Sequence, residues 1–301
     1  MKLEGWAKLK HGQRWVAWVP TLWLLLFFLI PFLVVAKISL SEAAIAMPPY
    51  LPVVEWLESG VAQIRLNFSN YLFLIEDPLY AASYWESVRI ALVSTLVTLL
   101  IGYPMAHVIA MSSEPRRTLL LILVILPFWT SFLLRVYAWI AILKTNGLLN
   151  SVLLHLGLIS EPLVILQTDL AVYLGIAYTY LPFMVLPLYA ALSRLDRTLL
   201  EASADLGATP WVSFFTVTLP LTLPGIFAGS LLVFVPAIGE FVIPALLGGN
   251  DTLMIGKVLW NEFFANREWP IASAVAIIKL CLIVGPLMWL NRLQAKQEGS
   301  A

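Results

Sequence analysis

The residue types that usually carry chemistry are sparse in this 301-residue chain, and their spacing matches no catalytic motif. The chain has no Gly-x-x-x-x-Gly-Lys-Ser/Thr phosphate loop, no His-Glu-x-x-His and no Gly-x-Ser-x-Gly. Its three histidines lie far apart, and its one cysteine, Cys281, excludes an intrachain disulfide. We therefore predict that the chain is not an enzyme and has no catalytic residue, metal site or cofactor of its own.

Charged residues inside long apolar runs are the remaining candidates, because an ionisable group at membrane depth is costly and commonly functional. There are three such residues: Arg135, Glu240 and Lys279. Arg135 and Glu240 fall at comparable depth in their runs, and two interpretations stay open. The two residues form a buried ion pair, or Glu240 lines a path for a cationic substrate and Arg135 competes for its carboxylate.

Aromatic residues lie near the same depth as these charges. Their rings are suited to cation–π contacts with an alkylammonium group, although such rings are also typical of interfacial belts and of helix packing. The predicted substrate path consists of Glu240, Arg135, Trp129, Tyr137, Tyr178 and Tyr180.

The composition indicates that most of the chain lies in lipid. It is 60% hydrophobic and 12% charged, with a mean hydropathy of +0.88, whereas soluble domains are about 45–50% apolar and about a quarter charged. A bilayer-spanning helix needs about 20 apolar residues. Six runs of that length predict an all-α, polytopic membrane protein with one membrane domain (1–301) and spans near 15–38, 87–111, 119–143, 170–192, 223–247 and 271–290.

The distribution of Lys and Arg predicts the orientation, because these residues are in excess in short cytoplasmic loops. The basic segments alternate with acidic or nearly uncharged ones, so they all fall on one side of the membrane. Both termini and the loop between the fourth and fifth spans are then cytoplasmic. The basic residues are Lys2, Lys8, Lys10 and Arg14; Arg116 and Arg117; Arg194 and Arg197; and Arg292 and Lys296.

The loop at 193–222 has the signals of a bent element made of two helices. Asp196 is a typical N-cap, Gly207 a left-handed stop, and Thr209-Pro210 a second N-cap followed by a first helical residue. Small residues permit another backbone to approach closely, and charges at the rim offer ion pairs. The predicted docking residues are Glu201, Ala202, Ser203, Asp205, Gly207 and Ala208.

This loop resembles the EAA loop of ABC-importer permeases. In that loop Glu-Ala-Ala, three residues, Gly, nine residues and Ile-x-Leu-Pro form the coupling helix that seats in a groove of the ATPase subunit. The spacing from Glu201 to Pro220 matches throughout, with Ser203 in place of the second Ala and Val217 in place of Ile. The resemblance implies a type I ABC importer permease fold and coupling to a separate ATPase, which binds ATP and Mg.

Further segments are similar to the putrescine/spermidine importer permeases, and to the putrescine permease above all. They are Lys37–Ser41, Met47–Tyr50, Ile125–Phe132, Arg135–Trp139 and Gly239–Pro244. The resemblance implies a multi-pass subunit of the bacterial inner membrane that carries polyamines, with spermidine left open beside putrescine. The implied partners are an ABC ATPase dimer, a second homologous permease, a periplasmic polyamine-binding protein and the lipid bilayer, with no nucleic acid.

Two other function classes are weaker. A secondary transporter of a small cationic solute, driven by an ion gradient, also has many spans and midplane charges. It needs no docking loop, however, and it usually shows internal repeats, which are not detectable here. An intramembrane enzyme needs a nucleophile and a base at membrane depth, and the sequence offers no such pair.

Overall fold

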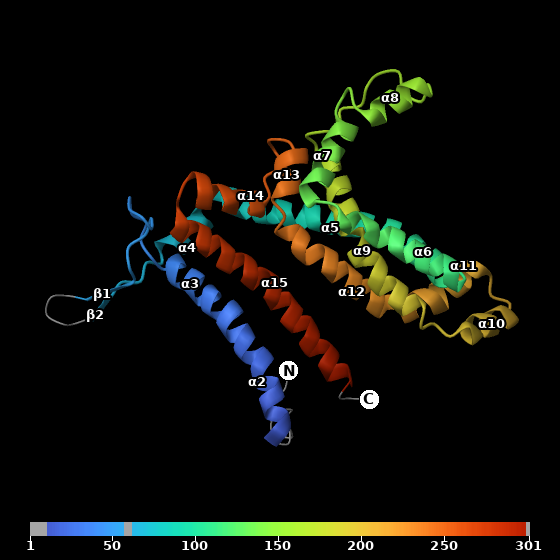
Figure 1. Cartoon of the computed structure of the whole chain (residues 1–301), viewed down its shortest axis with the longest axis horizontal. Helices are drawn as coiled ribbons and strands as arrows, with labels where there is room; N and C mark the ends of the chain where they lie inside the picture. The colour runs from blue at the N-terminus through green and yellow to red at the C-terminus, as the bar shows by residue number, and fades with distance from the viewer. Residues whose placement is uncertain (1–10, 57–61, 299–301) are drawn as a thin grey trace. The chain divides into compact units, whose positions relative to one another are not determined.

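The computed structural model describes residues 11–56 and 62–298. The chain divides into two compact units, Met1–Pro78 with Leu259–Ala301 and Leu79–Val258. Helices dominate the structure (Figure 1), and the first unit also holds an antiparallel ribbon of strands β1 (Val54–Trp56) and β2 (Ala62–Ile64). The prediction of an all-α chain is confirmed. The prediction of a single membrane domain stays a prediction.

The first unit is built on two long helical stretches that pack against each other through α3 and α15. The apolar window of Trp18–Ser39 has none of its residues buried. A helix that is apolar on all sides and uncovered is typical of a segment surrounded by lipid or by another protein. The helices of this unit are α2 (His11–Leu24), the π-helical η1 (Leu25–Leu29), α3 (Ile30–Ser39), α4 (Ser69–Glu76), the π-helical η4 (Asn261–Ala265) and α15 (Trp269–Glu298).

The second unit carries the predicted loop and two of the three predicted charges, Arg135 and Glu240, while Lys279 lies on α15 of the first unit. In Figure 1, α10 and α11 lie at one end of it, and α13 and α14 lie toward the other. Its helices are α5 (Pro78–Met111), α6 (Glu114–Ile125), the 3-10 turn η2 (Leu126–Trp129), α7 (Phe132–Leu143), α8 (Leu148–His155), α9 (Asp169–Leu192), α10 (Arg197–Asp205), α11 (Pro210–Ser213), the π-helical η3 (Phe214–Thr218), α12 (Leu219–Ile238), α13 (Val242–Leu247) and α14 (Ile255–Trp260).

Glycines allow α12 to lie close against α9. A Cβ built on Gly225 would come within 2.5 Å of the Ala191 Cβ, and one built on Gly229 within 2.9 Å of the Met184 sulfur. Met184 is fully buried. Small residues at such contacts are typical of helix packing in membranes, where tight van der Waals contact replaces the hydrophobic driving force.

Five helices in the described residues are long and apolar enough to span a membrane, and α15 adds a shorter apolar stretch, Trp269–Val284. The five are Trp18–Ser39, Pro78–Met111, Phe132–His155, Asp169–Leu192 and Pro210–Ile238. They overlap the first five predicted runs in order, and the third and fifth runs differ from the prediction in detail.

The third run, expected as one helix over 119–143, is interrupted. Pro127 lies in the η2 turn, and both Thr130 and Ser131 are extended, so α6 and α7 are separate helices. Proline removes a helical hydrogen bond and clashes with the preceding turn. The fifth run, expected over 223–247, begins earlier, at Pro210, and breaks at Gly239 before α13 begins.

Candidate coupling loop and intramembrane carboxylate

Helix α10 begins and ends on the residues that the sequence predicted. The Asp196 carboxylate accepts a hydrogen bond from the Thr198 N–H (3.0 Å), which lowers the pKa of this exposed side chain. At the other end, Gly207 has a φ of +80° and its N–H donates to the Ala204 carbonyl (2.8 Å). A Cβ at Gly207 would meet nothing within 4 Å, so the left-handed backbone and not crowding favours glycine.

The second helix of the loop is fixed to the first by one side-chain contact. Thr209 caps it, with Oγ1 accepting from the Val212 N–H (3.4 Å), and Pro210 is its first residue. The hydroxyls of Ser203 and Ser213 lie 2.6 Å apart and join the two helices. Ser203, which the sequence suggested was only a conservative replacement for Ala, is 9% exposed and makes this bond.

The outer surface of the loop is open and mixed in character. Glu201, Ala202, Asp205 and Gly207 are exposed and Ala208 is half-buried. Three large apolar side chains stand among them, with exposed fractions of 89% for Leu206, 74% for Trp211 and 46% for Leu199. Charges around uncovered apolar groups are typical of a protein-binding surface.

A hollow of about 660 Å³ lies between this loop and α5. Its wall combines apolar side chains with the polar groups of Tyr103, His107, Ser213 and Thr218. The Tyr103 hydroxyl is held 3.0 Å from Thr222 Oγ1 on α12. The loop therefore lies next to α5, which is bonded to α12 through Tyr103 and Thr222.

Glu240 lies two residues before Val242, the first residue of α13, and its carboxylate accepts four hydrogen bonds. Oε1 accepts from the backbone N–H groups of Phe241 (3.2 Å), Val242 (3.1 Å) and Ile243 (3.5 Å). Oε2 accepts from the Tyr180 hydroxyl on α9 (2.7 Å). Donors of this kind satisfy a carboxylate in its ionised form, so the charge is held without a cationic partner.

Of the two interpretations left open by the sequence, the ion pair between Arg135 and Glu240 is wrong for these two described residues. The Glu240 oxygens are already taken by Tyr180 and by the start of α13. The Arg135 guanidinium carbon instead lies 5.2 Å from the Phe128 ring centre and 5.9 Å from that of Phe132. Its Nε and Nη1 groups are buried and donate to no hydrogen-bond partner among the described residues.

The predicted aromatic residues separate into two groups. Tyr180 contacts Glu240, and its ring lies 6.2 Å from that of Phe183, which meets the Phe128 ring edge-on at 5.2 Å. Tyr178 packs edge-on against Trp139 at 5.5 Å. Trp129 is 78% exposed and Tyr137 56% exposed, and no contact joins either of them to the carboxylate.

Phe183 and the N–H groups of α13 are site components that the sequence analysis missed. Glu is not among the residues that usually cap a helix, and Phe241 stands between Glu240 and the first residue of α13, Val242. The sequence therefore carried no clear signal of a helix start, and an unbroken apolar run was expected there. The described residues contain no group of three or more His, Cys, Asp or Glu able to hold a metal ion.

A family model described as the binding-protein-dependent transport system inner membrane component matches residues 98–297. The chain belongs to this family. It is a permease subunit of an ABC transporter and a multi-pass inner-membrane protein, and it is not itself an enzyme. The docking loop and the Glu240 site both lie inside the matched residues.

This permease is similar to curated relatives over most of its length. It is 43% identical over 255 residues to the spermidine/putrescine transport system permease protein PotB of Haemophilus influenzae, covering 85% of this chain and 84% of the relative. It is 39% identical over 266 residues to PotB of Escherichia coli K12, covering 88% and 91%. It is 35% identical to the inner membrane ABC transporter permease protein YdcU of the same organism, covering 79% and 77%.

Solved structures support the fold. A bacterial ABC transporter involved in the import of the acidic polysaccharide alginate has a chain with a TM-score of 0.64 and 18% identity, covering 95% of this permease and 96% of that chain. A bacterial alginate ABC transporter in complex with an alginate pentasaccharide-bound periplasmic protein has a chain with a TM-score of 0.65. At this identity the likeness establishes the ABC importer permease fold alone.

Proposed function

We propose that this permease carries polyamines, putrescine or spermidine, into the cell as one subunit of an ATP-driven importer. The observation that carries the proposal is the 43% identity to a spermidine/putrescine permease over 85% of the chain. The family membership argues against the alternative of an ion-gradient-driven transporter. The predicted partners remain an ABC ATPase dimer that binds ATP and Mg, a second homologous permease and a periplasmic polyamine-binding protein.

The Glu240 site has the chemistry that an alkylammonium group needs. All of the donors to its carboxylate are neutral, namely three backbone N–H groups and the Tyr180 hydroxyl. The rings of Tyr180, Phe183 and Phe128 continue from it as an aromatic wall, which favours a cation. Arg135 lies over the far end of this wall. We assign Glu240 as the attracting group and Arg135 as a repelling one that limits how far a cation travels along the rings.

The loop around α10 is proposed as the element that seats in the ATPase. Leu206 and Trp211 supply uncovered apolar surface, and Glu201 and Asp205 supply the charges around it. Such an element has to face the cytoplasm, as the distribution of Lys and Arg predicts. A cysteine at Asp205 should then be protected from an impermeant thiol reagent in intact cells, and one at Glu161 should react, both in a Cys281→Ser background. The opposite labelling would refute the assignment.

Reconstitution tests the function. The permease, its ATPase, the second permease and the binding protein are placed in proteoliposomes, and ATP-dependent uptake of labelled putrescine is measured with spermidine or ornithine as competitor. Competition by spermidine and not by ornithine is expected. The absence of ATP-dependent putrescine uptake, together with no effect of spermidine, would refute the substrate class. A catalytically inactive ATPase is the control for leakage.

A further inference from the structure

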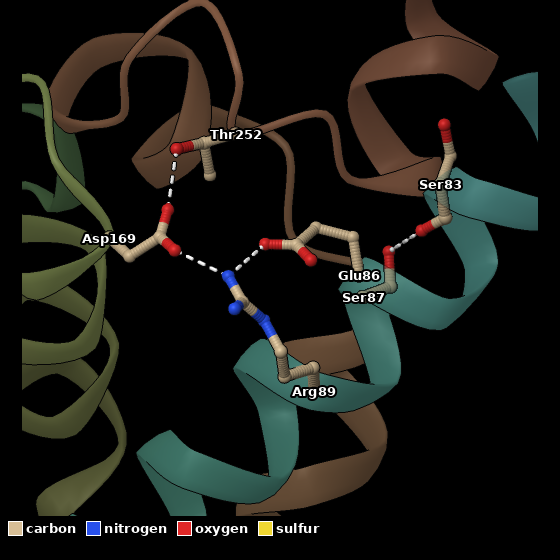
Figure 2. Close-up of polar contacts among 6 residues, drawn as sticks. All are labelled: Ser83, Glu86, Ser87, Arg89, Asp169 and Thr252. Atoms are coloured by element: carbon tan, nitrogen blue, oxygen red, sulfur yellow. Dashed lines mark hydrogen bonds and ion pairs between the residues drawn. The ribbon is translucent and has the colours of Figure 1, made fainter.

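Three segments that are distant in sequence meet at one polar cluster, which Figure 2 shows. Asp169 is the first residue of α9, and its Oδ1 accepts from the Thr252 hydroxyl (2.8 Å) in the segment between α13 and α14. Its Oδ2 accepts from Arg89 on α5, and the same Arg89 Nη2 also donates to Glu86 Oε1 (2.5 Å). One carboxylate thus links α5, α9 and residues 248–254.

A second set of bonds holds the same segment. The Ile255 N–H donates to the Ser87 hydroxyl (2.7 Å), and that hydroxyl donates to the Ser83 carbonyl (2.8 Å). The Gln167 N–H donates to the Leu247 carbonyl (2.8 Å) just before the segment begins. Thr252 is 2% exposed and Ile255 is fully buried. The segment is therefore fixed at both of its ends and in its middle.

The segment also reaches the Glu240 carboxylate through close backbone contacts. A Cβ on Gly256 would lie 2.6 Å from the carbonyl oxygens of both Glu240 and Gly239, so α14 begins directly against the break between α12 and α13. A Cβ on Gly175 of α9 would lie 2.6 Å from Leu247 Cδ1. Because there is no slack at either contact, a displacement of residues 248–256 also displaces Glu240.

Stability alone does not account for this arrangement. The side chains of Arg89 and Asp169 are 46% and 35% exposed, and ion pairs exposed to that extent contribute little to folding. The Thr252–Asp169 bond is different, because its donor is buried and its acceptor belongs to another helix. This bond fixes the position of Thr252 relative to the first residue of α9.

We propose that Asp169 is a positioning residue for transport. Through Thr252 it fixes the segment at 248–254 and so sets the position of Glu240, with Arg89 orienting the Asp169 carboxylate. The assignment rests on the proposed function in one respect only, namely that Glu240 contacts the substrate. The Arg89–Glu86 contact holds the guanidinium beside Asp169.

The first experiment reads the position of the segment without transport. Exposed Asp251 is replaced by Cys in a Cys281→Ser background and spin-labelled in the assembled complex, and the mobility of the label is recorded. Asp169→Ala and Thr252→Val should both increase the mobility. Thr252→Ser, which keeps the hydroxyl, and Glu161→Ala, on an exposed loop residue, should leave it unchanged. Unchanged mobility in both test variants would overturn the positioning role.

The second experiment connects the segment to Glu240. Uptake by Asp169→Ala and Thr252→Val should fall about 2- to 30-fold, the range in which residues that touch no ligand modulate coupling. Neither change should reduce uptake further when Glu240→Gln is already present, because all three act on one site. Co-purification of the other subunits controls for assembly. Fully additive losses would refute the connection, whereas increased mobility with no polyamine uptake by the unaltered complex would refute the proposed function alone.

Discussion

The two places where the second unit interrupts its helices are held in opposite ways. The turn between α10 and α11 is closed by residues of the loop itself, namely Asp196, Ser203, Gly207 and Thr209 with Ser213. The interruption from Gly239 to Met254 is held from outside, by Tyr180 and Asp169 on α9 and by Ser87 on α5.

The difference indicates how each region behaves when helices move. A turn closed by its own caps is less dependent on the relative position of other helices, as an element that transmits movement to a partner must be. A segment fixed by two other helices takes its shape from their relative position. The first region is therefore suited to act as a rigid body, and the second to respond to movement of α5 and α9.

The largest effect is expected when the rigid turn is deformed. Gly207→Val places a β-branched residue at a φ of +80°, a conformation that it adopts poorly. Uptake and substrate-stimulated ATP hydrolysis should be almost abolished, while the protein still inserts in the membrane. Gly157→Val is a matched control, because Gly157 has a φ of +66° and equally open surroundings, yet it lies outside the loop. Equal losses in both variants would mean that strain alone is responsible.

A smaller loss is expected at the externally held region. Glu240→Gln keeps an oxygen for the N–H groups of α13 but removes the charge, so uptake of a polyamine should fall about 10- to 100-fold, as the loss of a charge-assisted contact of ~1.5–3 kcal/mol predicts. Expression and unstimulated ATP hydrolysis should be unchanged. Tyr180→Phe keeps the charge of Glu240 and should reduce polyamine uptake less than Glu240→Gln does. Uptake that is unaffected by both changes would remove Glu240 from the path.

Arg135 provides a sharper test of the same region. Because its guanidinium contacts rings and not Glu240, Arg135→Gln should change uptake by only about 2- to 5-fold, the equivalent of an exposed-to-partly-buried cation–π contact of ~0.5–1 kcal/mol. When Arg135→Gln is combined with Glu240→Gln in the same chain, it should not restore uptake. Restoration in the double mutant, measured at equal expression, would revive the ion pair.

The smallest effect is expected at the two serines of the turn. Ser203→Ala or Ser213→Ala leaves one hydroxyl without its partner and should lower the stability of the permease by about 0.5–1.5 kcal/mol, the net value of a neutral hydrogen bond. The double change should cost no more than either single one, since no unpaired hydroxyl remains. Thermal unfolding of the purified permease in detergent measures the stability of the two single variants and of the double variant. A double change that costs the sum of both would contradict the pairing.

The sequence predicted the turn almost residue by residue, because each of its signals acts within one helical turn. Asp196, Gly207 and Thr209 took the positions expected of them. The Glu240 site could not be predicted in the same way. Depth along a helix places Arg135 and Glu240 at the same level but says nothing about which way each faces, and an apolar run from 223 to 247 gives no sign of a break at Gly239.

Contacts between residues far apart in the chain could not be predicted from the sequence for a related reason. The bonds from Asp169 to Thr252 and from Ser87 to Ile255 join residues far apart in the chain, and the choice of partner depends on how α5 and α9 pack. The apolar character of the spans was easy to predict, since it depends on composition alone. The pairing of polar groups between them depends on rotation and register, which no local pattern records.

The glycine contacts of α9 have a mechanical consequence. Gly225 and Gly229 bring α12 against it, and Gly175 brings α13 against it, so none of the three elements has room to slide past another. Tyr180 sits on α9, and Glu240 sits between the other two. Helices α9, α12 and α13 should therefore move together as one rigid body during transport. The hydrogen bond between Tyr180 and Glu240 should persist whether the transport path is open to the outside of the cell or to the inside.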